Sequence, residues 1–275
     1  MNIAVLSGKG GTGKTTVSTN LSLALGYNYI DCDVEEPNGF LFLRPFNIEE
    51  IEVEVEYPII DEEKCKACGK CAEICSFNAL AKLKNNIMVF EKLCHSCGAC
   101  KLVCNYNAVN YEKRLIGKIQ KGRLNNITCQ RGILNIGEPM AVPIIKRLLS
   151  NLKGDNLLDC SPGTSCNVVN TIKSVDRAVL VTEPSLFGLH DLKMAVGLLK
   201  TFNIPFGVII NKEQNSKNII RDYCTEENIS VLGSIPYSKD IAVKYSNGEM
   251  LYDNLEYKNI FNKLSQNIKK VLLWN

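Results

Sequence analysis

Eight of the 13 cysteines fall in two runs with the same internal spacing. Each run has the form C-x2-C-x2-C-x3-C, and the second begins 29 residues after the first. Thiolates at this spacing are typical ligands of [4Fe–4S] clusters, where three cysteines of one run hold one cluster and the fourth ligates the other cluster. The spacing therefore assigns one cluster to Cys65, Cys68, Cys71 and Cys104, and a second to Cys94, Cys97, Cys100 and Cys75.

A pair of all-cysteine zinc sites is the alternative reading of these runs. Zinc sites do not require the exchange of the fourth ligand between runs, so we favour iron. The runs depart from the usual pattern at one point, because Ser76 and Asn105 replace the proline that normally follows the fourth cysteine. All eight ligands remain, so the departure concerns the local turn.

A second chemical motif lies at residues 8–15, which read GKGGTGKT. This segment satisfies the phosphate-loop pattern G-x-x-x-x-G-K-[ST] between a strand and a helix. The glycines let backbone N–H groups face phosphate oxygens, and the helix N-terminus favours an anion. We expect Lys14 to bridge the β- and γ-phosphates of ATP and Thr15 to ligate Mg²⁺. The predicted nucleotide contacts in this loop are Gly8, Lys9, Gly10, Gly11, Thr12, Gly13, Lys14, Thr15 and Thr16.

The elements that position these motifs alternate between strands and helices. Strand-like runs occur at 3–6, 27–32, 156–160, 178–182, 206–210 and 231–235, and a period-2 alternation at 51–57 predicts a half-buried strand. Helical stretches occur near 14–25, 139–152, 189–202 and 217–227. This rhythm predicts an α/β fold with a mostly parallel sheet covered by helices on both faces. We assign residues 1–60 and 113–275 to that domain, and residues 61–112 to a small inserted α+β domain.

The phosphate loop resembles the deviant Walker A group of P-loop ATPases, whose members include MinD, ParA and the nitrogenase iron protein. The shared feature is the sequence K-G-G-T-G-K-T, in which the first lysine is Lys9. The resemblance implies an ATPase that forms a homodimer, in which Lys9 reaches the partner's nucleotide and neutralises charge in the transition state. The insert in turn resembles the two-cluster bacterial ferredoxin.

Further segments match the same family in order along the chain. By resemblance, Asp33 orients the attacking water, and Asp159 holds Mg²⁺ through water. Asn211 would hydrogen-bond the adenine, and Pro236 and Tyr237 would flank it. Alone, Asp33 and Asn211 are typical cap or turn residues, but their places at strand ends favour the functional reading, because ligands of open α/β sheets bind there.

Five cysteines lie outside the two runs, namely Cys32, Cys129, Cys160, Cys166 and Cys224. Free cysteines are commonly buried as small apolar side chains, which is our expectation for each. Cys166 is a partial exception. It lies seven residues after Asp159 in the sequence, a separation similar to that of a cluster ligand in the nitrogenase iron protein. A third cluster, shared between two subunits by Cys166 and Cys129, is therefore an alternative.

Composition and charge limit the classes of binding partner that we expect. The chain has 275 residues and a net charge of +3, with no apolar run long enough to span a bilayer and no signal-peptide pattern at its start. We expect a cytoplasmic protein that binds neither nucleic acid nor membranes. The basic stretch 113–123 is predicted to be a solvated edge strand. An apolar stripe near the C-terminus is predicted to pack on the sheet rather than on a membrane.

These patterns together predict an iron–sulfur ATPase. ATP binding and hydrolysis would be coupled to electron transfer through two [4Fe–4S] clusters toward an unknown redox partner. Two alternatives remain at this point. One is an ATP-gated carrier or scaffold for iron–sulfur units, and the other is a redox-sensing positioning ATPase.

Overall fold

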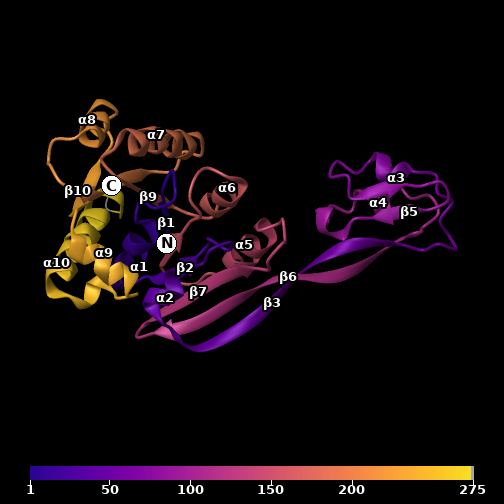
Figure 1. Cartoon of the computed structure of the whole chain (residues 1–275), viewed down its shortest axis with the longest axis horizontal. Coiled ribbons are helices and arrows are strands. Elements are labelled where there is room, and N and C mark those ends of the chain that lie inside the picture. Colours follow the sequence, from indigo (N-terminus) through magenta and orange to yellow (C-terminus); the bar gives the residue numbers. More distant parts are fainter. Residues whose placement is uncertain (274–275) are drawn as a thin grey trace.

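The computed structural model describes residues 1–273 and has two lobes joined by a long two-stranded ribbon (Figure 1). The strands are β1 (Asn2–Leu6), β2 (Asn28–Asp31), β3 (Phe46–Ile60), β4 (Leu80–Lys82), β5 (Ile87–Val89), β6 (Val109–Leu124), β7 (Ile127–Leu134), β8 (Asn156–Asp159), β9 (Arg177–Thr182), β10 (Phe206–Glu213) and β11 (Val231–Pro236). The α-helices are α1 (Lys14–Leu25), α2 (Gly39–Leu43), α3 (Lys70–Glu73), α4 (Ala99–Leu102), α5 (Val142–Leu149), α6 (Cys166–Ile172), α7 (Leu186–Thr201), α8 (Ile219–Glu226), α9 (Lys239–Ser246) and α10 (Leu255–Ile268). Three short turns of helix complete the chain, η1 (Glu91–Leu93), η2 (Leu251–Asp253) and η3 (Lys269–Leu273).

The larger lobe is built on a nine-stranded sheet of order β11-β10-β9-β1-β8-β2-β7-β6-β3. Pairing is parallel from β11 to β7, and antiparallel at the two remaining pairs. Alternate residues of β1 enter different cores. Ile3 and Val5 pack with α1 and α10, while Ala4 and Leu6 pack with α6, α7 and α8. The predicted α/β fold, with helices on both faces of a mostly parallel sheet, is confirmed.

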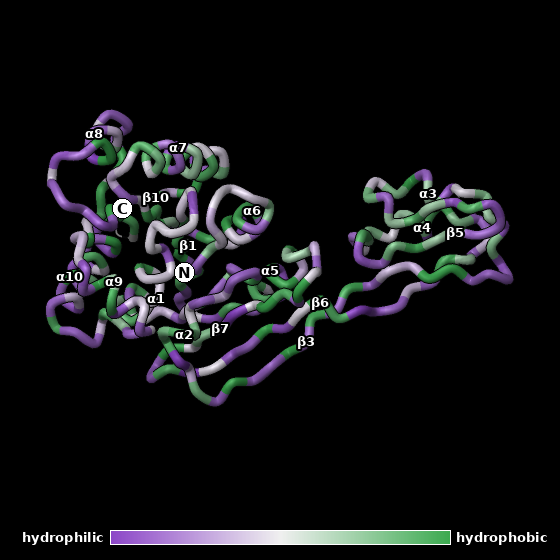
Figure 2. Tube along the Cα trace, in the orientation of Figure 1, coloured by the Kyte–Doolittle hydropathy of each residue, from purple (hydrophilic) through white to green (hydrophobic). Residues whose placement is uncertain are grey.

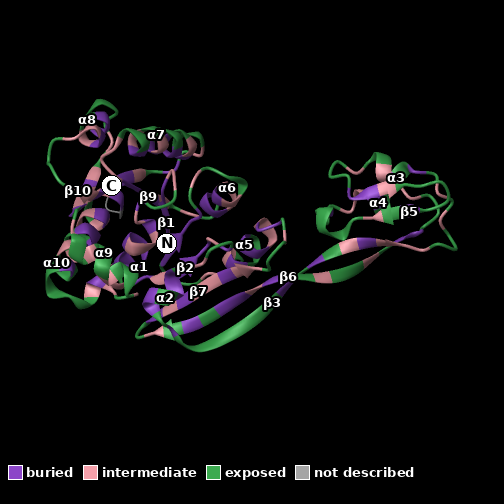
Figure 3. Ribbon diagram, viewed as in Figure 1, coloured by how far each residue is buried: buried purple, intermediate pink, exposed green. Residues whose placement is uncertain are grey.

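The ribbon consists of β3 and β6, which run from the sheet into the smaller lobe (Figure 1). β3 ends at Ile60, at the first predicted domain boundary, whereas β6 passes without a break through the second boundary near residue 113. Much of β3 is exposed, whereas β6 is more buried near the sheet (Figure 3). Figure 2 shows the period-2 alternation of polar and apolar residues along β3.

The prediction that the basic stretch 113–123 forms an edge strand is wrong. The stretch lies in β6, between β7 and β3, and the edge is β3. Its lysines face glutamates of β3, with ion pairs between Lys118 and Glu50 at 2.9 Å and between Lys113 and Glu54 at 3.4 Å. The positive charge is balanced within the chain by the acidic neighbour strand.

The smaller lobe preserves the sequence repeat in its backbone. Helices α3 and α4 occupy equivalent places in the two halves, and positive φ angles recur at residue pairs 29 apart: Ala67 and Ser96, Gly69 and Gly98, Asn78 and Asn107. Strands β4 and β5 pair with each other, and the outer ends of β3 and β6 pair in the same way. The lobe is thus two copies of one structural unit.

The C-terminal stripe packs on the sheet as predicted, since Leu264, Ile268 and Leu272 are buried in the core with α1. Among residues 1–273, no helix has the length and apolar character needed to cross a membrane. The helix predicted at 139–152 is shorter and occupies Val142–Leu149. Short helices α2, α6 and α9 were not predicted from the sequence.

Candidate functional site

The phosphate loop connects β1 to α1 at the carboxyl edge of the parallel strands. Gly11 and Gly13 have φ angles of 79° and 89°, a region that glycine adopts without steric cost. A β-carbon on Gly13 would also lie 2.2 Å from the Asn211 side-chain nitrogen, so only glycine fits. The first turn of α1 has no acidic residue and no side-chain cap, which leaves its N–H groups available to an anion.

Gly8 fills a different requirement. A β-carbon at this position would lie 2.3 Å from the backbone oxygen of Asp191 in α7. The glycine thus allows the loop to approach α7 closely.

A buried ion pair links the loop to β8. Lys14 Nζ lies 2.6 Å from Asp159 Oδ1, and the two side chains are 7% and 1% exposed. Burial by itself lowers the pKa of Lys14, but the charge and hydrogen bond of Asp159 raise it above its ordinary value. Tyr29 donates a 2.9 Å hydrogen bond to the other oxygen of Asp159. The lysine is therefore held as a cation directly behind the loop.

Two more carboxyl groups lie near this pair. Asp31 accepts hydrogen bonds from the backbone N–H groups of Gly39 at 3.0 Å and Asp33 at 3.2 Å. Burial, followed by repulsion from Asp159, raises the pKa of Asp31 to about 7. Burial likewise raises the pKa of Asp33 to about 6, although Lys14 opposes the shift. Through its hydrogen bond from the Asp33 N–H, the Asp31 carboxyl also stabilises the turn that contains Asp33.

A cavity of about 510 Å³ opens in front of the loop. Its lining includes most residues predicted for the nucleotide, namely Lys9, Gly10, Gly11, Gly13, Lys14, Thr15, Thr16, Asp33, Asn211, Pro236 and Tyr237. Gly8, Thr12 and Asp159 lie outside this lining. Asn211 donates a 2.7 Å hydrogen bond to the Thr12 carbonyl oxygen, which connects β10 to the loop. The volume is within the range of ligand sites.

The structure adds residues that the sequence did not single out. Ile241, Ala242 and Tyr245 of α9 close one wall of the cavity. Glu183 pairs with two lysines, Lys9 at 2.9 Å and Lys212 at 3.0 Å. No motif pointed to Glu183 or to the α9 residues, because they approach the loop or the cavity from segments far away in sequence.

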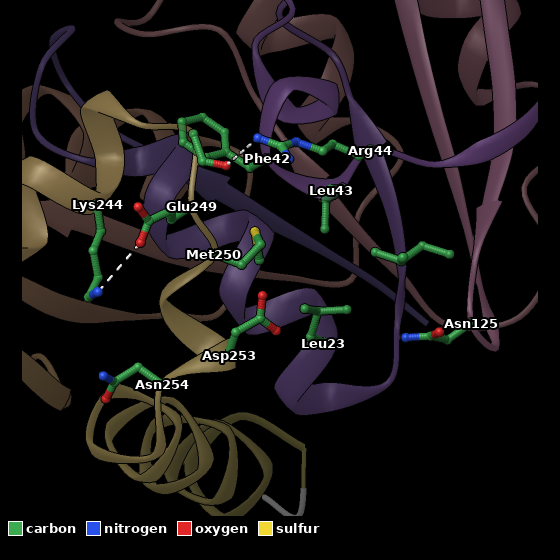
Figure 4. Close-up of a pocket in the computed structure, with 12 residues that line it drawn as sticks. Leu23, Phe42, Leu43, Arg44, Asn125, Lys244, Glu249, Met250, Asp253 and Asn254 are labelled. Carbon is green, nitrogen blue, oxygen red and sulfur yellow. Dashed lines mark hydrogen bonds and ion pairs between the residues drawn. The ribbon is translucent and has the colours of Figure 1, made fainter.

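A second cavity, of about 570 Å³, is lined by Lys244 of α9 and by Phe42 and Leu43 of α2, and is drawn in Figure 4. Lys244 and Glu249 form a 3.4 Å ion pair on its wall. Phe42 lines this second cavity, and Tyr245 lines the first one. The centres of their rings are 5.0 Å apart, so the two side chains lie between the cavities. None of the predicted site residues lines this second cavity.

In the smaller lobe, thiols of both runs come together. A hollow is lined by Cys65, Cys68, Cys71 and Cys104, together with aliphatic side chains such as Ile60 and Ile87. The fourth cysteine of the second run thus joins the first three of the first run. Burial raises the pKa of the Cys94 thiol, and the nearby thiols of Cys100, Cys97 and Cys75 raise it further. The two groups correspond to the two predicted ligand sets.

The backbone around these thiols also fits metal–sulfur clusters. N–H groups donate to cysteine sulfur in pairs related by the repeat: from Ala67 to Cys65 and Ser96 to Cys94, both at 3.4 Å, and from Ala79 to Cys75 at 3.3 Å and Ala108 to Cys104 at 3.4 Å. Hydrogen bonds to sulfur are a recognised influence on cluster potential.

Within residues 1–273, no group of three or more His, Cys, Asp or Glu side chains is arranged so that it could hold a metal ion.

The remaining cysteines are mostly buried, as expected. Cys32, Cys160 and Cys224 are at most 1% exposed. Cys129 is also fully buried in β7, so the suggestion that it ligates a cluster shared between subunits is wrong. Cys166 is exposed at the start of α6.

The chain is similar in sequence and in fold to known nucleotide-binding proteins. The sequence model of the CobQ/CobB/MinD/ParA nucleotide binding domain matches residues 3–251. An uncharacterized protein of Methanocaldococcus jannaschii is 33% identical over 289 residues, with 100% of this chain and 98% of that protein covered. An iron–sulfur cluster carrier protein of Pyrococcus horikoshii is 24% identical, with 81% of this chain and 63% of the carrier covered. Among solved structures, septum site-determining protein MinD of Pyrococcus horikoshii, complexed with Mg-ADP, has a TM-score of 0.61 at 20% identity and covers 98% of this chain and 96% of its own.

Proposed function

The chain belongs to the CobQ/CobB/MinD/ParA nucleotide-binding family, and from that premise we propose that it is a homodimeric ATPase whose nucleotide state controls electron transfer through two [4Fe–4S] clusters. One observation carries the proposal. A phosphate-loop cavity and a hollow lined by four cysteines occur in one chain, joined by two strands that are continuous between them.

The nucleotide part of the proposal uses groups already near the cavity. Lys14 is a buried cation, and Asp159 lies 2.6 Å from it. On binding of MgATP, the phosphates would attract Lys14, and Mg²⁺ would be held by Thr15 and, through water, by Asp159. Asn211 would contact the adenine, and its place in the lining of the same cavity, together with Pro236 and Tyr237, supports this role.

Asp33 would orient the attacking water. Its carboxyl lines the same cavity as Lys14 and Thr15. With a pKa of about 6, it is mostly ionised at neutral pH and can accept a hydrogen bond from water.

Lys9 and its surroundings support the homodimer. Lys9 Nζ is paired with Glu183 and lies 6.0 Å from the centre of the Phe187 ring. Leu186 and Phe187 are 77% and 78% exposed. A lysine beside exposed apolar side chains fits the edge of an interface with a second copy of the chain, in which Lys9 would reach the partner's phosphates. We expect Lys9→Ala to keep ATP binding and to lose hydrolysis, as measured by phosphate release beside nucleotide affinity.

A continuous set of contacts leads from Asp33 toward the ribbon. The turn after Asp33 accepts a 2.8 Å hydrogen bond at the Val34 carbonyl oxygen from Leu134 N–H. The next residue, Asn135, donates 2.9 Å to the Ile116 carbonyl oxygen. Ile116 has no partner in β3, because the register shifts between Val53 and Glu54. Movement of the turn would thus act on β6 at an irregular point.

The clusters, when bound, would supply one-electron transfer. The residues that would hold them are the two cysteine sets described above. The test is anaerobic purification with iron and sulfide counting, followed by a redox titration monitored by EPR with and without MgATP. We expect about eight irons per chain for two cubanes, and midpoint potentials that change with MgATP. Potentials and electron transfer that are identical in both conditions would refute the coupling.

An ATP-gated iron–sulfur carrier is a second candidate. Cys68 and Cys97, one from each run, are exposed, so each site has a ligand within reach of an acceptor. The match to a relative named as an iron–sulfur cluster carrier protein, which covers 81% of this chain, also supports the carrier function. Transfer of iron and sulfide to an apo-protein on addition of MgATP would favour this function, and full retention would exclude it.

A further inference from the structure

The two cysteine sites are nearly equal in backbone structure. Beyond the paired N–H···S bonds, Phe90 N–H donates to the Ala79 carbonyl oxygen and Asp61 N–H donates to that of Ala108, both at 2.8 Å and related by the 29-residue repeat. Local backbone geometry therefore gives both sites the same donors. A difference between them has to come from side chains.

The clearest difference lies at residue 111 and its equivalent in the first half, residue 82. Tyr111 in β6 places its hydroxyl oxygen 3.3 Å from Cys100 Sγ. The equivalent residue in β4 is Lys82, whose ammonium bonds to the Cys68 carbonyl oxygen at 3.3 Å and is exposed to solvent. Of the two sites, only the second thus has a hydroxyl group within hydrogen-bond distance of a cysteine sulfur.

The direction of this hydrogen bond follows from the chemistry of the site. A cysteine that ligates iron is a thiolate and has no proton to donate, so the tyrosine hydroxyl must be the donor. One-electron reduction makes the cluster and its sulfurs more negative. A donor on sulfur stabilises the reduced form more than the oxidised form, and raises the reduction potential.

We propose that Tyr111 is a positioning residue that acts through Cys100 and raises the potential of the cluster held by Cys94, Cys97, Cys100 and Cys75. The proposal rests on the proposed function, since it requires clusters at both sites. It goes further in making the two clusters unequal, and in assigning the difference to one hydroxyl group.

Both sites contact the ribbon, the first through Ile60 of β3 and Val109 of β6, and the second through polar groups. Tyr111 is part of β6, and Ser96 in the second run donates a side-chain hydrogen bond to the Glu56 carbonyl oxygen of β3. Lys101 lies on α4, the helix that contains Cys100, and its ammonium is 5.6 Å from the centre of the Tyr111 ring. A change in β6 would therefore act directly on a cluster ligand, because the Tyr111 hydroxyl contacts the Cys100 sulfur.

The experiment is an EPR-monitored redox titration of the full-length protein, purified anaerobically, as wild type and as Tyr111→Phe. We expect one midpoint to fall, with the ratio of reduced to oxidised cluster at fixed potential about tenfold lower, or about 59 mV for one electron. The other midpoint should not move. Tyr57→Phe is the matched control, because its hydroxyl lies on the same ribbon but bonds to Glu112 at 3.0 Å.

The signal is assigned with Cys104→Ser, which leaves a complete ligand set only at the second site. Tyr111→Phe in that background should lower the potential of the remaining cubane. Equal shifts of both midpoints, no shift of either, or an equal shift with Tyr57→Phe would overturn the proposal. Absence of two cubanes in the wild-type protein would overturn both this inference and the proposed function. Two normal cubanes with an unchanged variant would overturn only the inference.

Discussion

Substitution of Gly13 separates two effects that the structure places at the same residue. Gly13→Ala forces a β-carbon into a backbone with φ of 89° and to within 2.2 Å of the Asn211 side-chain nitrogen. The left-handed backbone costs an alanine about 1–2 kcal/mol. Displacement of Asn211 also breaks its buried 2.7 Å hydrogen bond to Thr12, worth about 1 kcal/mol. The expected loss in the free energy of unfolding is about 2–3 kcal/mol.

Gly26→Ala is the matched control at the other end of α1. Gly26 has a φ of 72°, but a β-carbon there meets nothing within 4 Å. It should therefore cost only the backbone term of about 1–2 kcal/mol. Urea unfolding followed by circular dichroism gives both stabilities, and calorimetric titration with MgATP gives the affinities. We expect Gly13→Ala alone to lose nucleotide binding. Equal stability losses with equal affinities would refute the reading of Asn211 as a wall of the site.

Three further predictions address the buried charges and the cysteines. Lys14→Met should abolish MgATP binding and destabilise the fold by about 3–5 kcal/mol, measured by urea unfolding, because it leaves Asp159 buried without its cation. Asp31 holds its proton to about pH 7 in the folded state but releases it near 3.8 when unfolded, so it contributes stability below pH 4 that is lost as the pH rises to about 7. Relative to wild type, Asp31→Asn should therefore gain stability over this window; a constant difference in urea midpoints would contradict the assignment. Cys104→Ser should lose the cluster of the first run and Cys75→Ser that of the second, as judged by iron content and EPR; loss from the substituted run would exclude the exchanged ligation.

Much of the nucleotide site could be predicted from the sequence because its parts are local. The phosphate loop is contiguous, and Asp33 and Asn211 mark strand ends that the apolar runs reveal. Other parts could not be predicted. Glu183 and Tyr245 approach the loop only because the parallel strands and α9 converge at one edge of the sheet. Nothing in the residues next to either one indicates that contact.

The basic stretch 113–123 illustrates the same limit. Its basic charge is visible in the sequence, and the prediction that it forms a strand is correct. Its neighbouring strands are not visible in the sequence, and the edge assignment was wrong because β3 pairs with β6 on its outer side and brings Glu50 within 2.9 Å of Lys118. Strand order is a property of long-range pairing, which local composition does not encode.

The sequence by itself determined the phosphate loop and the two repeated cysteine runs, because both depend on spacing along a few residues. Only the tertiary structure decided which groups meet. It paired Glu183 with Lys9, buried Cys129 in β7, and set the hydroxyl of Tyr111 beside the sulfur of Cys100. The reason is physical: spacing fixes what a segment can bind, whereas burial and contact depend on chain segments that are distant in sequence.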